Sequence, residues 1–150
     1  MSTTERTIVI TGASSGFGAA AVRAFAERGD RVWGTMRDTD GRNADKKAAL
    51  EAQSSNISIV DMDVASDASV DAGFASILAE GPVDVLINNA GIMYIGLTEA
   101  FSLAQAQEQM ETNYFGAIRA MQAVLPGMRA AGKGLIINTS SLVGRISPPF

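Results

Sequence analysis

The chain has 150 residues, 47% of them hydrophobic and 19% charged, so it can bury the core of one domain. Twelve Lys and Arg against sixteen Asp and Glu give a net charge of −4, which argues against a nucleic-acid partner. Cys and His are both absent, and this excludes a thiol nucleophile, a Ser-His-Asp triad, a Cys/His zinc site and disulfides. We therefore expect no bound metal, and chemistry that depends on hydroxyl, amide, carboxylate or Lys groups or on a borrowed cofactor.

The pattern of charge and hydropathy bears on location. Glu5 and Arg6 lie where a secretory signal would need an apolar run. No uncharged apolar stretch approaches the ~18 residues of a membrane span. We therefore expect a cytoplasmic protein that does not associate with membranes.

Short apolar runs alternate with segments of helical pattern, which predicts parallel strands joined by crossover helices. The expected strands are 7–11, 32–36, 57–61, 83–88 and 135–139. The expected helices are 17–28, 45–52, 68–78 and 103–128. Strand centres such as those of TIVIT and DVLIN are continuously apolar, as expected when helices cover both faces of a sheet. The sequence thus predicts an α/β fold in which one doubly wound parallel sheet, within a single domain of residues 1–150, lies between two layers of helices.

The last helical region carries one apolar stripe with a period of 3.6 residues. Its members are Tyr114, Ala117, Ile118, Met121, Leu125 and Met128. Pro126 lacks a backbone N–H, and we expect it to kink or end this helix.

The first strand leads directly into a glycine-rich turn, TGASSGFG at residues 11–18, and a helix opens at Phe17. Backbone N–H groups in such a turn and the positive end of the helix dipole attract phosphate. Gly12, Gly16 and Gly18 have no side chains to block a ligand. The turn is therefore a candidate nucleotide site, and because no Gly-Lys-Ser/Thr follows, it is not a P-loop.

The same motif also fits an ordinary strand-to-helix turn. Its place at the first strand–helix junction of an alternating α/β chain favours a nucleotide site. The serines would add hydroxyls for the same phosphates, or act only as turn formers. We assign cofactor contacts in this turn to Gly12, Ser14, Ser15, Gly16, Phe17 and Gly18.

The end of the second strand indicates which dinucleotide the turn would hold. Sites for NAD place Asp or Glu there, whereas a neutral residue followed by Arg suits the 2′-phosphate of NADP. Here the strand ends at Met36, and Arg37 follows, able to clamp a phosphate through two hydrogen bonds. The sequence therefore favours NADP. In the alternative interpretation, Arg37 merely opens a solvated loop at 37–46 with six charges in ten residues, and Asp38 partly neutralises it.

Three further segments follow the later strands. They are Asp61-Met-Asp63-Val64, Asn88-Asn-Ala-Gly91 and Asn138-Thr-Ser-Ser141. Together with the glycine turn and Asn113, and in order and spacing over essentially the whole chain, they resemble the short-chain dehydrogenase/reductase family. The resemblance implies a Rossmann-type fold and hydride transfer between a nicotinamide and a carbonyl or alcohol carbon.

The resemblance also implies roles for individual residues. Asp63 would bond the adenine amino group, and Val64 would pack on the ring. Asn89, Ala90 and Gly91 would line the adenosine ribose and the switch point of the sheet. If the resemblance is set aside, Asp63 is explained as a carboxylate at a helix N-terminus. Asn88 and Asn89 are then explained as side chains that satisfy backbone groups at the end of a strand.

Two residues would take part in catalysis. Asn113 would hold a water in a proton relay from inside the long helix, and Ser141 would orient the substrate carbonyl. Without the family, Asn113 is a helix-starting residue, and Ser140 and Ser141 are turn residues. Family spacing counted back from Gly144 selects Ser141.

The family further needs a Tyr whose pKa is lowered by a Lys four residues later. Spacing places that Tyr near position 154, beyond Phe150, and neither Tyr94 nor Tyr114 has a Lys four residues on. We therefore expect the chain to be the N-terminal portion of a protein of about 250 residues, truncated after the fifth strand and inactive alone.

The leading hypothesis is an NADP-dependent oxidoreductase for a small carbonyl or alcohol substrate, of which this chain carries the cofactor-binding half. The alternative is a non-catalytic NADP-binding sensor or scaffold, because the cradle is present and the Tyr/Lys pair is not. A methyltransferase of similar topology is disfavoured, since such enzymes usually need an acidic residue where Met36 lies. By family analogy, a homo-oligomer would form through the helix at 113–128.

Overall fold

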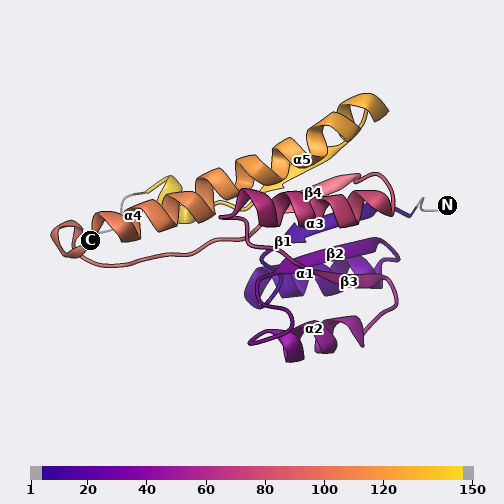
Figure 1. Ribbon diagram of the computed structural model, residues 1–150, viewed down its shortest axis with the longest axis horizontal. Coiled ribbons are helices and arrows are strands. Elements are labelled where there is room, and N and C mark those ends of the chain that lie inside the picture. Colours follow the sequence, from indigo (N-terminus) through magenta and orange to yellow (C-terminus); the bar gives the residue numbers. More distant parts are fainter. Residues whose placement is uncertain (1–4, 147–150) are drawn as a thin grey trace.

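A computed structural model describes residues 5–146 and shows one parallel five-stranded sheet with the order β3-β2-β1-β4-β5 (Figure 1). The strands are β1 (Thr7–Thr11), β2 (Arg31–Met36), β3 (Ile57–Asp61), β4 (Val85–Asn88) and β5 (Leu135–Asn138). Chain order reverses between β1 and β4, so a switch point lies between their carboxyl ends. The predicted Rossmann-type, doubly wound sheet is confirmed.

Helices cover the two faces of this sheet. The main ones are α1 (Gly16–Glu27), α2 (Ala44–Glu51), α3 (Asp67–Ala79), α4 (Leu103–Met110) and α5 (Gly116–Ala131). In Figure 1, α1 and α2 lie on the side of the sheet opposite α3 and α5. The crossover helices are therefore divided between the faces, as the continuously apolar strands predicted.

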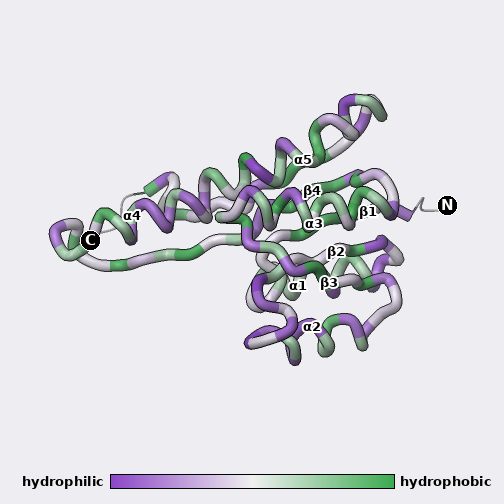
Figure 2. Tube along the Cα trace, viewed as in Figure 1, coloured by the Kyte–Doolittle hydropathy of each residue, from purple (hydrophilic) through white to green (hydrophobic). Residues whose placement is uncertain are grey.

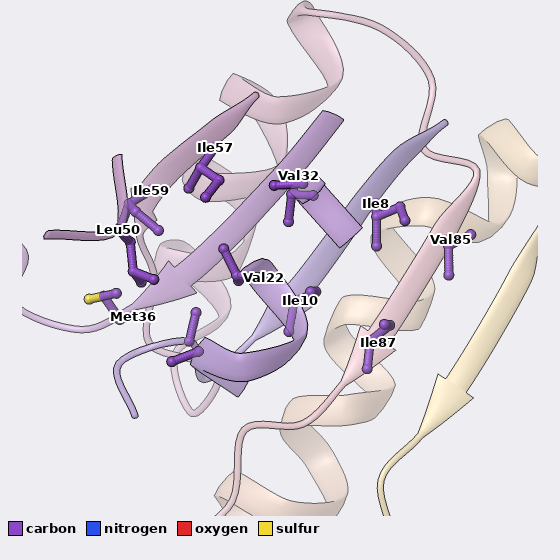
Figure 3. Packing of buried hydrophobic residues seen from close by; sticks show 13 residues of the cluster. Ile8, Ile10, Val22, Val32, Met36, Leu50, Ile57, Ile59, Val85 and Ile87 are labelled. Carbon is purple, nitrogen blue, oxygen red and sulfur yellow. The ribbon is translucent and has the colours of Figure 1, made fainter. Parts of the chain in front are cut away.

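Each face has its own buried core, because alternate residues of a strand point to opposite sides. Ile8 and Ile10 of β1 pack with Val22 of α1 and Leu50 of α2 (Figure 3). Val9, between the two isoleucines, packs in the other cluster with α3 and α5. Figure 2 shows hydrophobic colouring along the central strands β1 and β4 and mixed colouring along the helices. Strands β1 to β4 are thus held from both sides, whereas β5, at the end of the sheet, stays largely exposed.

The long helix predicted over 103–128 is divided by a π-helix, η2 (Glu111–Phe115), between α4 and α5. The N–H of Gly116 donates to the carbonyl of Glu111, five residues back. Pro126 lies inside α5, which continues to Ala131, so of the two expected effects, a kink or an end, the end is not found at Pro126. Pro126 lies on the exposed side, where water can replace the lost bond, and the helix ends instead at Gly132, whose φ is +64°.

The buried side of α5 also differs from the predicted stripe. Its buried residues are Gly116, Ala120, Val124 and Met128, of which only Met128 belongs to the predicted stripe, and Tyr114 of that stripe is 54% exposed. The prediction followed the large apolar residues, whereas the first half of the buried side uses the small residues Gly116 and Ala120. A Cβ atom at Gly116 would lie 2.8 Å from a methyl carbon of Val64.

Charged groups pin the amino ends of the strands. Arg6, before β1, donates two hydrogen bonds to Asp30, before β2, at 2.9 and 2.7 Å. Asp84, before β4, accepts from the N–H of Thr7 at 3.0 Å and from Lys133 at 2.9 Å. These contacts join the four neighbouring strands β2, β1, β4 and β5 at one edge and leave the carboxyl edge to carry a site.

The Arg6–Asp30 pair leads to a prediction about acid stability. Hydrogen bonding from Arg6 holds the pKa of Asp30 below its usual value. The pair therefore stabilises the fold above the unfolded-state pKa of about 3.9, and this contribution is lost as pH falls through the lower folded-state pKa. We expect Asp30→Asn to reduce the free energy of unfolding at pH 7 by roughly 1–2 kcal/mol, after allowance for the exposure of Arg6.

Urea unfolding between pH 2 and pH 7 measures both effects. Asp30→Asn should show a smaller loss of stability below pH 4 than the unmodified chain, because it lacks the titrating group. Asp71→Asn removes the same charge at an exposed position of α3 and should change stability by less than about 0.5 kcal/mol. Identical acid limbs for the Asp30 variant and the unmodified chain would contradict the assignment.

Candidate cofactor-binding site

A cavity of about 560 Å³ opens at the carboxyl edge of the sheet, beside the switch point. Its walls come from the segments that follow β1, β2, β3 and β4. Nine predicted site residues line it, namely Gly12, Ser14, Ser15, Arg37, Asp63, Val64, Asn89, Ala90 and Gly91. The fold thus brings together residues that lie far apart in the sequence.

Two glycines of the turn are required by close packing. Gly12 has φ +72°, and a Cβ atom there would lie 2.7 Å from the Cα of Ala90. A Cβ atom at Gly18 would overlap the carbonyl oxygen of Gly12 and lie 2.6 Å from the side-chain nitrogen of Asn89. The turn after β1 therefore lies directly against the segment after β4 because these positions carry no side chains.

Helix α1 directs its N-terminus toward the turn, with Ser15 as its extended N-cap residue. The first turn of α1 contains no acidic residue, so its positive end is free for an external anion. Gly16 has φ +56° and open space around its Cα. Phe17 is 85% exposed and does not line the cavity, which leaves its backbone N–H as the group it can offer to a phosphate.

Thr11 is a site residue that the sequence analysis missed as an individual contributor. Its hydroxyl accepts hydrogen bonds from the N–H groups of Asn89 and Ala90, both at 3.0 Å. In return, the side-chain NH₂ group of Asn89 donates hydrogen bonds to the carbonyl oxygens of Thr11 and Gly12 at 3.0 and 3.1 Å. Asn89 therefore satisfies backbone groups at the strand end, as its alternative interpretation required, and lines the cavity as well.

Cationic residues form one rim of the cavity. Arg37 is joined there by Arg42 and Lys46, with Asn43 between them. The last three were missed, although six charges in ten residues were visible and the spacing of 42 and 46 fits one face of a helix.

The segment 37–46 is largely exposed, as expected of a solvated loop, but it is ordered, and its last three residues belong to α2. Asn43 is buried and donates to the carbonyl of Arg37 at 2.6 Å, and Thr39 is buried against the carboxylate of Asp61. Asp38, at φ +55°, accepts from the N–H of Arg42 at 3.1 Å. The loop is held in shape by these bonds, and it presents its cations to the cavity.

Asp63 lies across the cavity from the turn and has partners of its own. Its carboxylate accepts from the N–H of Ala65 at 3.0 Å and lies 3.6 Å from the guanidinium of Arg37. Its N–H donates to the hydroxyl of Ser69 at 2.9 Å. The ion pair with Arg37 is long and half-exposed, so a ligand phosphate can compete for the arginine at small cost.

Asn113 does not line the cavity, but it holds a residue that does. Its side-chain oxygen accepts from the N–H of Ile92, and its side-chain nitrogen donates to the carbonyl of the same residue, both at 2.8 Å. Asn113 lies within η2, beside Thr112, which lines the cavity. Its expected part in a proton relay stays a prediction.

Ser141 lies outside the cavity lining, after β5 and before the short helix η3 (Leu142–Gly144). Its carbonyl accepts from the N–H of Gly144 at 3.0 Å. Asn88 and Asn138 join the carboxyl ends of β4 and β5 through a side-chain hydrogen bond of 2.8 Å. Ser141 is therefore on the edge of the sheet that carries the cavity, and its role toward a substrate stays a prediction.

Residues 5–146 hold neither an acidic cluster suited to a metal ion nor a helix able to span a membrane. Acidic side chains do not gather there in any group of three or more that could hold a metal ion. Over the same residues, no helix combines the length and the apolar character needed to traverse a bilayer.

Comparison with known proteins identifies the family. The sequence model of the family described as short chain dehydrogenase matches residues 6–150. The chain therefore belongs to the short-chain dehydrogenase family, and the resemblance noted from its motifs is confirmed.

Relatives from distant organisms match nearly all of the chain. Retinol dehydrogenase 8 of Homo sapiens is 40% identical over 147 residues, which cover 96% of this chain and 47% of the relative. A 3-ketodihydrosphingosine reductase of Bacteroides thetaiotaomicron is also 40% identical over 147 residues, covering 95% and 49%. The chain thus spans about half the length of these relatives.

Solved structures show the same fold. A short-chain dehydrogenase from Streptomyces avermitilis superposes with a TM-score of 0.89 at 36% identity, over 98% of this chain and 53% of the other. An NADPH-bound carbonyl reductase from chicken fatty liver gives 0.85 at 30% identity, over 95% and 62%. A gluconate 5-dehydrogenase from Burkholderia cenocepacia, in complex with NADP and tartrate, gives 0.86 at 30% identity, over 96% and 56%.

The packing at Gly18 predicts the effect of one added methyl group. Gly18→Ala should destabilise the chain by roughly 1–3 kcal/mol and disturb the turn, because the new Cβ atom meets rigid backbone and Asn89. Chemical denaturation measures the loss. Gly127→Ala is the matched control, since Gly127 is also helical but has open space around it, and should stabilise by roughly 0.5–1 kcal/mol. Equal stability of the two variants would refute the packing role of Gly18.

Proposed function

We propose that this chain is the cofactor-binding half of an NADP-dependent oxidoreductase that transfers a hydride between the nicotinamide and a small carbonyl or alcohol substrate. The observation that carries the proposal is the cavity at the switch point, where a glycine turn, a helix N-terminus and a cationic rim face one space. The glycine turn and the helix N-terminus suit the pyrophosphate of a dinucleotide, and the cationic rim suits the additional 2′-phosphate of NADP.

The residues present fit the adenosine end of NADP better than that of NAD. The segment after β2 offers Arg37 and Arg42, and Lys46 follows on α2, whereas no carboxylate of this segment lines the cavity. Asp38, which could have neutralised Arg37, instead accepts a hydrogen bond from the N–H of Arg42 and lies 3.8 Å from the guanidinium of the latter. Three cations on one rim suit the doubly charged 2′-phosphate that distinguishes NADP.

When bound, NADP supplies or accepts the hydride, and the chain's own residues bind and orient. The turn from Gly12 to Gly18 and the N-terminus of α1 would hold the pyrophosphate. Asp63 would accept from the adenine amino group, and Val64, which is buried at the cavity wall, would pack on the ring. Ser141 would orient the substrate carbonyl, and proton transfer would need the Tyr/Lys pair expected near position 154.

The named relatives support the class of substrate. Retinol dehydrogenase 8 carries an alcohol in its name, and the carbonyl reductase and the 3-ketodihydrosphingosine reductase carry a carbonyl group in theirs. Two of the similar structures contain NADPH or NADP. These likenesses favour alcohol–carbonyl interconversion for the whole protein.

The cofactor preference is tested by Arg37→Asp. This change removes a phosphate-binding cation and adds a carboxylate suited to a free ribose hydroxyl, so NADPH affinity should fall by about ten- to a hundredfold while NADH affinity rises. Calorimetric titration of each dinucleotide measures the shift. Arg23→Asp makes the same change of charge on α1, outside the cavity lining, and should leave the NADPH-to-NADH ratio nearly unchanged. An unchanged ratio for the Arg37 variant would overturn the NADP assignment.

The reaction class is tested on the product of the full coding sequence. We expect NADPH oxidation that depends on an added ketone or aldehyde and that is lost in Ser141→Ala, with cofactor binding retained. Saturable NADPH binding without turnover for any carbonyl in a broad panel would favour the sensor or scaffold alternative. Absence of NADPH binding would remove the proposal altogether.

A further inference from the structure

Arg119 of α5 connects three separate segments behind the cavity. Its guanidinium pairs with Asp67, at the start of α3, and with Glu111, the first residue of η2, at 2.8 Å. It also donates to the backbone carbonyl of Val64 at 3.3 Å and lies 3.5 Å from the carbonyl oxygen of Glu111. One side chain thus meets the segment after β3, the helix that follows it and the π-helix.

Two of these segments form walls of the cavity. Val64 lines it on the side assigned to adenine, and Thr112, directly after Glu111, lines it next to Asn113. Gly116 of α5 packs directly against Val64, because a Cβ atom at this position would lie 2.8 Å from a methyl carbon of Val64 and 3.1 Å from its carbonyl oxygen. Arg119 therefore holds Val64 against the same helix that carries Asn113.

We propose that Arg119 is a positioning residue that couples the adenine wall at Val64 to the π-helix carrying Thr112 and Asn113, without itself touching the cofactor. This inference rests on the proposed function, because it takes the part of the cavity beside Val64 to be the place of the adenosine end of NADP. It adds a residue that neither the glycine turn nor the cationic rim includes.

The chemistry of the side chain suits this role. A planar guanidinium donates in several fixed directions at once, so it can hold two carboxylates and a carbonyl in one geometry. Lysine carries the same charge but lacks the fixed fork. Hydrogen bonds to Asp67 and Glu111 raise the pKa of Arg119 above its already high usual value, so the charge persists throughout the working pH range. Its side chain is only 20% exposed, which limits screening of the contacts by solvent.

The coupling is tested first without any cofactor, by amide hydrogen exchange. In Arg119→Met, which keeps much of the apolar stem but removes all donors, amides of residues 64–69 and 111–116 should both exchange about tenfold faster. Arg31→Met is the matched control, because Arg31 also binds a carboxylate and a carbonyl, those of Glu80, but at the amino edge of the sheet. In that variant the two segments should exchange as in the unmodified chain.

The second readout is NADPH affinity, measured by calorimetry on the same variants. Arg119→Met should bind NADPH and 2′,5′-ADP about tenfold more weakly, whereas Arg31→Met should bind both normally even if it is equally destabilised. Arg119→Lys should recover little of the affinity, because charge alone does not restore the fork. If Arg119→Met does not fold, Asp67→Asn, at an 81% exposed side chain, removes one arm of the network and should show the same changes at two- to threefold size.

The outcomes separate this inference from the proposed function. NADPH binding by the unmodified chain, with unchanged exchange and affinity in the Arg119 and Asp67 variants, would overturn the positioning role alone. Faster exchange in only one of the two segments, or equal loss of affinity in Arg31→Met, would also overturn it. Coupled exchange in both segments without NADPH binding by the unmodified chain would instead retain the mechanical coupling and reject the cofactor assignment.

Discussion

The contact between the turn after β1 and the segment after β4 is the constraint on which the rest of the site depends. Gly12 and Gly18 have no side chains, so the turn can lie against Ala90 and Asn89 at distances that a Cβ atom would not allow. The Thr11 hydroxyl and the Asn89 amide then bond across the same junction. Because neighbouring parallel strands end at the same edge, this junction also sets the position of α1, whose positive end faces the cavity.

The two edges of the sheet use charge differently. At the amino edge, Arg6, Arg31 and Lys133 each contact a carboxylate at 2.7–3.0 Å and so serve to join strands and helices. At the carboxyl edge, Arg37 and Arg42 lie 3.6 and 3.8 Å from their acidic neighbours. Longer ion pairs hold their cations weakly, which leaves these two arginines able to turn toward a ligand phosphate. Although the net charge of the chain is −4, the rim of the cavity formed by Arg37, Arg42 and Lys46 is locally positive.

Helix α5 both covers one face of the sheet and supports the back of the cavity. Its buried side begins with the small residues Gly116 and Ala120, and the missing side chain at Gly116 lets the helix approach Val64, after β3, closely. The π-helix before it directs Asn113 toward Ile92 and Thr112 toward the cavity. Arg119 adds charged hydrogen bonds to the same contact. The cavity wall at Val64 and the π-helix that carries Asn113 thus share one support.

Local chemistry in the sequence was enough to determine the strands, the parallel sheet, the glycine turn and the family, because apolar periodicity, glycine spacing and short motifs are properties of neighbouring residues. The tertiary structure alone decided the parts that depend on distant contacts. The loop at 37–46 is ordered because Thr39 meets Asp61 and its own Asn43 folds back on Arg37, and this turns Arg42 and Lys46 toward the cavity. The buried side of α5 includes Gly116 and Ala120 beside Val124 and Met128, since the close approach to Val64 leaves no room for a side chain at position 116. Arg119 gains its partners only when α3, η2 and α5 pack together, and the sequence pattern does not indicate which helices pack together.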